Sequence, residues 1–201
     1  DIPWSLIPER KIGVDEVKYI LSSYYQGTKY NPYSVTSEKR GVYRSIGINR
    51  TGVMAILQLR PYVDVENQAI EWICFGPNNF NTVLPMYTNV ESLPKYVSGT
   101  TLTIDSTSFY WQSRLIGALA DPYYGSCIQM VERYQNTTLA QGHELVNKYD
   151  KLFTEKKDLS LLNKANEEVC KMGNKETMKV LDQLLLNATA KMKNGYNRAD
   201  N

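Results

Sequence analysis

Three cysteines and one histidine are the side chains of this chain best suited to act as nucleophile or base. The thiols are Cys74, Cys127 and Cys170, and the imidazole is His143. A thiol activated by imidazole needs the two groups in contact, and nothing in the spacing brings His143 to any of the thiols. Wide, irregular cysteine spacing with a single imidazole also gives no zinc motif. The sequence therefore predicts mostly buried free thiols, no metal site and no catalytic residue among these four.

Other catalytic signatures are missing from the sequence. There is no G-x-S-x-G elbow for a serine hydrolase, and neither G-x-G-x-x-G nor a P-loop that would cradle a nucleotide phosphate. We therefore expect no cofactor. The 23 basic and 21 acidic residues leave a net charge of only +2, which argues against a nucleic-acid partner. No apolar run reaches the roughly 18 residues that span a bilayer, so no membrane partner is expected.

Asn49 and Arg50 are the candidate binding residues that the pattern alone suggests. They end an expected strand at a tight turn before Gly52. An arginine fork can hold a carboxylate through two parallel hydrogen bonds, as recognition of a peptide terminus requires. Both residues also fit an ordinary surface role, because the arginine head group prefers water. We name Asn49 and Arg50 as candidate substrate contacts.

The elements that would position these residues begin with a helix. Apolar residues from Val14 to Tyr24 recur at helical spacing, which predicts about three turns. Gly27 is expected to end this helix and Pro32 to prevent its resumption. Three tyrosines around that stop either cover the end of a core or form a recognition patch. They are Tyr25, Tyr30 and Tyr33.

The middle of the chain has the period of β-strands. Residues 41–49, 53–61 and 69–76 are short, rich in β-branched and aromatic residues, and bounded by turn residues, which predicts a three-stranded antiparallel meander. Shorter extended pieces are expected at 83–87 and 101–104. Between the strand over 69–76 and the piece at 83–87, Asn78 and Asn79 are interpreted as turn formers.

Helical periodicity dominates the chain after residue 105. Helices are expected over 109–120, 124–153, 159–172 and 175–193. Asp105 or Ser106 is the expected cap of the first, and Gly173 and Asn174 are expected to separate the last two. Segregated strands and helices predict an α+β fold, here one domain over 1–201, with a helix and antiparallel strands in 1–104 and a mainly helical part in 105–201.

Six segments, taken in order, resemble one enzyme family. They are LSSYYQGTKYNPYS, SIGINRT, LQLRP, IEWICFGPNNFNTVLPMYTNV, FYWQSRLIGALAD and the terminal NRADN. The set resembles the bacterial dipeptidase A family of N-terminal-nucleophile (Ntn) cysteine hydrolases, to which the secernins are related. In that family such segments form the C-terminal portion of a longer polypeptide. The resemblance covers nearly the whole chain.

The resemblance implies a broad-specificity cysteine dipeptidase with an αββα sandwich. The nucleophile of that family is a cysteine at residue one, whose own α-amine acts as base near neutral pH. None of the three cysteines here matches that position, so we expect the nucleophile on a missing N-terminal segment and no activity from this chain alone. Related amide hydrolases have an arginine shortly before the first helix. This implies Arg10, with Lys11 as an equal contender, as a substrate-binding residue.

A partial sandwich would leave an apolar sheet face and strand edges open. We therefore expect this chain to associate with the missing N-terminal segment or with copies of itself. Two alternatives stay open: a non-catalytic binding module that uses the tyrosine patch, and an Ntn amidase that acts on acyl-amides. Free thiols favour a cytoplasmic location, and secretion stays open as the alternative.

Overall fold

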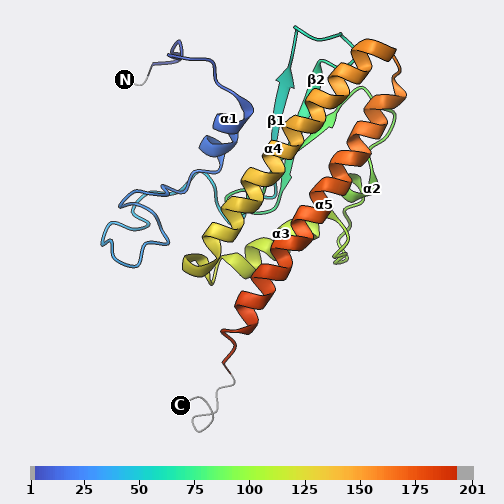
Figure 1. Ribbon diagram of the computed structural model, residues 1–201. Helices are drawn as coiled ribbons and strands as arrows, with labels where there is room; N and C mark the ends of the chain where they lie inside the picture. The colour runs from blue at the N-terminus through green and yellow to red at the C-terminus, as the bar shows by residue number, and fades with distance from the viewer. Residues whose placement is uncertain (1–2, 194–201) are drawn as a thin grey trace.

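The computed structural model describes residues 3–193, so the NRADN segment lies outside the described residues. A three-stranded antiparallel sheet in the order β1-β2-β3 is its centre. The strands are β1 (Val53–Leu59), β2 (Ala69–Phe75) and β3 (Leu84–Tyr87). Two long helices, α4 (Tyr124–Lys156) and α5 (Ser160–Thr189), run side by side over one face of this sheet (Figure 1). The predicted α+β class is confirmed.

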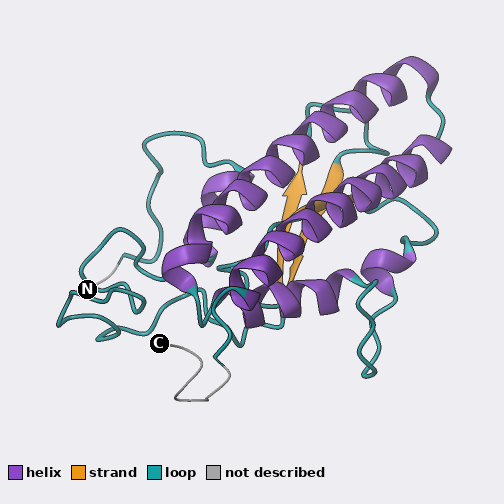
Figure 2. Cartoon of the chain, turned by 60° about the horizontal axis from the view of Figure 1, so that its bottom comes forward, coloured by secondary structure: helices purple, strands orange, loops and turns teal. Residues whose placement is uncertain are grey.

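The two long helices lie over the sheet, as Figure 2 shows, and the core residues lie between them. Ile70, Trp72 and Cys74 alternate along β2 and are at most 1% exposed, and they cluster with Tyr149 and Phe153 of α4. Burying side chains of this size contributes about 1.5–3 kcal/mol each. The opposite face of β1 is open.

Three shorter helices complete the fold: α1 (Val14–Leu21), α2 (Lys95–Ser98) and α3 (Phe109–Ala120). α3 packs against α5 and reaches the end of β2, where the rings of Phe75 and Phe109 are 5.6 Å apart. Its cap is Ser108, whose Oγ accepts a hydrogen bond from the Trp111 N–H at 3.4 Å. The expected cap at Asp105 or Ser106 was therefore wrong by two or three positions.

The predicted strand over 41–49 is not formed, and β3 takes its place as the third strand. Gly47 explains why. Its N–H donates to the carbonyl of Ser23 at 2.8 Å, and a Cβ there would lie 2.4 Å from the carbonyl oxygen of Ser22. The segment therefore docks closely on the end of α1 instead of joining the sheet.

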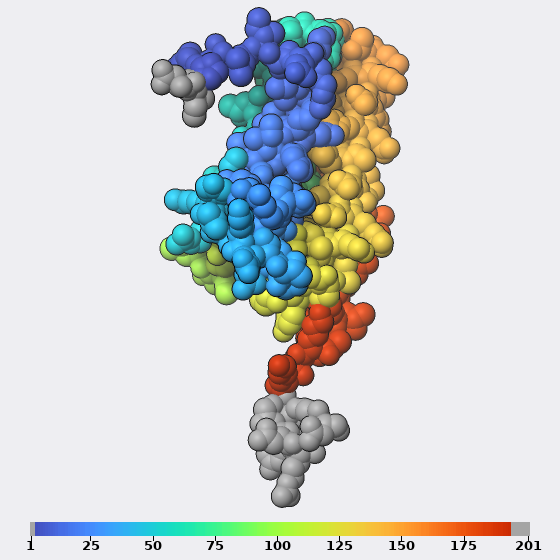
Figure 3. Space-filling view, turned by 90° about the vertical axis from the view of Figure 1, so that its left-hand side faces the viewer, coloured from blue at the N-terminus to red at the C-terminus, as the bar shows by residue number. Residues whose placement is uncertain are grey.

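The same contact shortens α1. In a continued helix the Ser23 carbonyl would accept from the N–H four residues on, but it accepts from Gly47. α1 ends at Leu21, and Tyr25 already has a positive φ of 62°. The prediction that Gly27 ends the helix was wrong. Figure 3 shows the N-terminal residues lying along α4.

The predicted break at Gly173 is also absent, because α5 runs through it. A Cβ at Gly173 would lie 2.7 Å from Cδ1 of Leu84 on β3. Glycine here permits close approach of helix and sheet and does not end the helix. Gly142 in α4 has a similar role, since a Cβ there would lie 3.1 Å from Cδ of Pro85 on β3.

Candidate functional site

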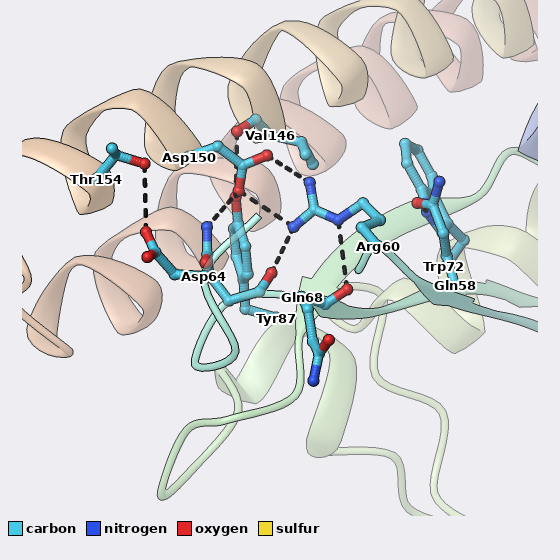
Figure 4. Close-up of polar contacts among 10 residues, drawn as sticks. Gln58, Arg60, Asp64, Gln68, Trp72, Tyr87, Val146, Asp150 and Thr154 are labelled. Atoms are coloured by element: carbon cyan, nitrogen blue, oxygen red, sulfur yellow. Dashed lines mark hydrogen bonds and ion pairs between the residues drawn. The ribbon is translucent and has the colours of Figure 1, made fainter. Parts of the chain in front are cut away.

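A buried charge pair joins the turn between β1 and β2 to α4 (Figure 4). Arg60, 3% exposed, donates to both carboxylate oxygens of Asp150 and to the carbonyl of Gln68 at 3.4 Å. Asp150 also accepts from the Tyr87 hydroxyl at 2.9 Å and the Asn67 amide at 2.7 Å. Because the guanidinium and the carboxylate are fully engaged with each other, we assign this network a structural role.

The turn after β2 is also buried and polar, but its polar groups are not fully paired. We call its residues, 76–82, the asparagine turn. Asn78, Asn79 and Asn81 are 3%, 4% and 0% exposed. The side-chain oxygen of each lacks a hydrogen-bond partner among the described residues. A buried polar atom without a partner costs about 1–3 kcal/mol, and such atoms are rare enough to need an explanation. The asparagine turn is therefore the centre of the candidate site.

Close packing against α3 holds the asparagine turn in place. Gly76 adopts a φ of 68° and approaches the backbone of Ser113, and a Cβ on Gly117 would lie 2.5 Å from the ring of Pro77. The Asn81 amide donates to the carbonyls of Pro77 at 2.9 Å and of Ser113 at 3.0 Å. These contacts with α3 at both ends of the asparagine turn restrict its movement.

A polar cluster lies on one side of this turn. The Asn79 amide donates to Oδ1 of Asn49 at 3.3 Å, and the Asn49 amide donates to Asp121. The Tyr33 hydroxyl donates to Asp121 Oδ1 at 2.6 Å, and Arg114 donates to the Asn49 carbonyl at 3.4 Å. Burial, together with the neighbouring Asp121, raises the pKa of Tyr33, so its hydroxyl remains a donor at neutral pH.

A cavity of about 350 Å³ lies on the other side, between α1 and α4, and we call it the Lys18 cavity. Lys18 on α1 is 9% exposed and donates to the Asn78 carbonyl at 3.3 Å. Burial lowers its pKa. Ser22, 5% exposed, also lines the cavity, and its hydroxyl has no partner in the described part of the chain. The cavity thus offers several free hydrogen-bonding positions.

Of the three thiols, only that of Cys74 lies close enough to Lys18 for each group to affect the pKa of the other. Cys74, Cys127 and Cys170 are free and buried, as the sequence predicts. Burial raises the pKa of Cys74 and of Cys170 to about 12 and also raises that of Cys127. The thiolate is the nucleophilic form, so all three are unreactive at neutral pH. His143 contacts Asp15, with Nε2 2.7 Å from Oδ1, and packs on Trp72.

Within residues 3–193, no three His, Cys, Asp or Glu side chains are grouped so that they could hold a metal ion. None of the helices in this range combines the length and apolar character needed to cross a bilayer.

The structure brings one of the predicted site residues, Asn49, to the asparagine turn. Arg10 instead pairs with Glu16 at the start of α1, with 75% of its side chain exposed. Arg50 is exposed. Among residues 3–193 no hydrogen bond or ion pair joins Arg10 or Arg50 to Asn49, and the substrate roles of all three remain predictions.

The tyrosines predicted as a patch separate into two groups. Tyr33 stacks on Tyr124 with centroids 4.1 Å apart and joins the polar cluster. Tyr25 and Tyr30 pack against Tyr43 at 6.2 and 4.9 Å. Only Tyr33 contributes to the candidate site.

Sequence reasoning missed Lys18, Arg114 and Asp121. Lys18 had a signal, because it lies four residues after Val14 and four before Ser22, on the buried stripe of a helix. The contacts of Asp121 to Tyr33 and Asn49 join segments far apart in the chain. No local pattern indicates such a contact.

Comparison with known proteins gives a consistent result. Residues 1–137 match peptidase family C69. The chain is 35% identical over its full length to a dipeptidase of Bifidobacterium longum, covering 46% of that protein. It is 37% identical over 99% of its length to a probable dipeptidase A of Streptococcus pyogenes serotype M18, covering 42%. A probable dipeptidase B of Lactococcus lactis is 34% identical over 96% of this chain, which covers 41% of that relative. The chain thus spans less than half the length of these curated relatives.

Proposed function

This chain belongs to peptidase family C69, and we propose on that premise that it is part of a cysteine-type dipeptidase of broad specificity. The observation that carries the proposal is the similarity of 35–37% identity, over essentially the whole chain, to relatives named dipeptidase or probable dipeptidase. The polar cluster and the cavity around the asparagine turn supply hydrogen-bonding groups of the kind that a peptide requires.

The catalytic thiol of this enzyme lies outside these 201 residues. Support comes from Cys74, Cys127 and Cys170, which are at most 5% exposed. Their raised pKa values keep them protonated at neutral pH, whereas catalytic cysteines are exposed and acidic. The same three reduced thiols fit a reducing compartment, which is why we place the enzyme in the cytoplasm.

Further polypeptide covers the open face of the sheet. Val53, Leu57 and Leu59 of β1 are 58%, 78% and 73% exposed, and β1 pairs only with β2 among the described residues. Exposed apolar strands at a sheet edge favour association. The covering surface is the remainder of the enzyme, since the chain spans less than half of its relatives, or a second copy in a homo-oligomer.

Asn49 contacts the substrate from the polar cluster, and Arg10 and Arg50 contribute positive charge at the surface. These assignments rest on the ability of amide and guanidinium groups to bind peptide termini.

The test is hydrolysis by the complete gene product. Free amino acids released from a panel of dipeptides are measured beside a panel of acyl-amides, with and without iodoacetamide. We expect dipeptides to be cleaved, acyl-amides to be poor substrates, and alkylation to abolish turnover. Alanine variants of the three buried cysteines serve as controls that keep activity. Absence of dipeptide cleavage would overturn the proposal, as would equal activity of the isolated 201-residue chain.

A further inference from the structure

Lys18 is a buried amine without an acidic partner among the described residues. Its ammonium makes one hydrogen bond, to the Asn78 carbonyl, and within residues 3–193 it forms no ion pair. No carboxylate is among the groups that shift its pKa, which burial lowers. An uncompensated buried charge costs several kcal/mol. Such a charge is stabilised when a negatively charged ligand forms an ion pair with it.

Two more residues that line the same cavity each have an unsatisfied side-chain atom. Ser22 Oγ and Asn79 Oδ1 are buried without partners in the described structure, and both residues line the cavity beside Lys18. Its volume of about 350 Å³ is at the lower end of small-molecule sites, about 300–1,000 Å³. A larger hollow of about 440 Å³ lies beside α2, but most of its lining residues are exposed.

The chemistry of the cavity wall selects one class of ligand. The ammonium of Lys18 and the hydroxyl of Ser22 donate hydrogen bonds, as a carboxylate needs, whereas the Asn79 oxygen accepts from an N–H. The carboxylates of Asp15 and Glu132 also line the cavity. They favour a ligand with an amine and oppose a multiply charged anion such as phosphate. A small zwitterionic peptide meets all of these requirements.

We propose that the Lys18 cavity binds the free carboxylate of a dipeptide, with Lys18 and Ser22 as donors and Asn79 as the acceptor of a peptide N–H. This inference rests on the proposed function and explains why the enzyme would prefer peptides with a free carboxylate. A peptide that lacks a free carboxylate leaves the buried ammonium unpaired and is bound weakly. Lys18 is thus a specificity-determining residue.

The experiment compares Lys18→Met in the complete gene product with Lys151→Met, which removes an exposed lysine from α4. Steady-state kinetics are measured for one dipeptide and for its C-terminal amide. Because hydrogen bonds to charged groups are worth about 1.5–3 kcal/mol, we expect Lys18→Met to raise KM for the dipeptide about 10- to 100-fold. KM for the amide and kcat for both should change little. Lys151→Met should match the wild type.

Equal KM values for wild type and a folded Lys18→Met enzyme would overturn the subsite while leaving dipeptide hydrolysis established. If Lys18→Met does not fold, the wild-type enzyme decides: equal KM values for dipeptide and amide would overturn the inference. Absence of turnover of any dipeptide would overturn the proposed function and the inference together.

Discussion

The carboxylate of Asp121 satisfies two donors from distant parts of the chain. It accepts hydrogen bonds from Tyr33, 88 positions away, and from Asn49, 72 positions away. The long irregular segment between α1 and β1 contains both donors. One residue at the end of α3 therefore fixes a segment that has no helix or strand of its own.

Asp121→Ala should destabilise the chain because it leaves the Asn49 amide without its acceptor and the Tyr33 hydroxyl with only the longer contact to Asn49 Oδ1 at 3.3 Å. A fully buried group left unsatisfied costs about 1–3 kcal/mol, and these groups are partly buried, so a loss of about 1–2 kcal/mol is expected. The free energy of unfolding is measured by urea denaturation. Asp182→Ala, at an exposed position of α5, is the matched control and should have no effect. A stability equal to wild type for Asp121→Ala would show that the cluster does not hold this segment.

At the scale of elements, the contact between α5 and β3 depends on the absence of a side chain at Gly173. Gly173→Ala should be destabilising although alanine favours helices by about 1 kcal/mol, because its Cβ would lie 2.7 Å from Leu84. Overpacking of this kind costs about 1–3 kcal/mol. The melting temperature is the measurement. Gly125→Ala in α4, where no atom lies within 4 Å of the new Cβ, should instead leave stability unchanged or raise it.

Gly173 and Gly47 show which elements can be predicted from the sequence. β1, β2, α3 and α4 follow from local periodicity and were predicted. The break at Gly173 and the strand over 41–49 were wrong, because the roles of Gly173 and Gly47 depend on Leu84 and Ser22, which are remote in sequence. A local pattern identifies a glycine but not the atom that it approaches.

In the candidate site, too, the sequence identifies single residues but not their distant contacts. Asn49 was predicted because it ends a segment at a turn, and Asn79 was assigned a turn, where it lies. The burial of Lys18 and the acceptor role of Asp121 arise from packing between segments. Individual residue types were thus accessible from the sequence, whereas their grouping around the asparagine turn required the fold.

At the scale of the whole molecule, the two faces of the sheet are unequal. One face packs against α4 and α5 and forms the core. The other exposes Leu57 and Leu59 at 78% and 73% beside the open edge of β1. Since removing apolar surface from water is worth roughly 25 cal/mol per Å², the isolated chain is expected to self-associate through this face.

Leu57→Lys combined with Leu59→Lys should reduce that association, because charged side chains protect an open strand edge. Sedimentation velocity over a range of concentrations is the measurement, with a rising average mass expected for the wild-type chain and a constant monomer mass for the variant. Leu186→Lys, at another exposed apolar position of 72% on α5, should associate as the wild type does. If all three proteins are monomers, the open face needs no covering partner. If Leu186→Lys is the variant that dissociates, association occurs through α5.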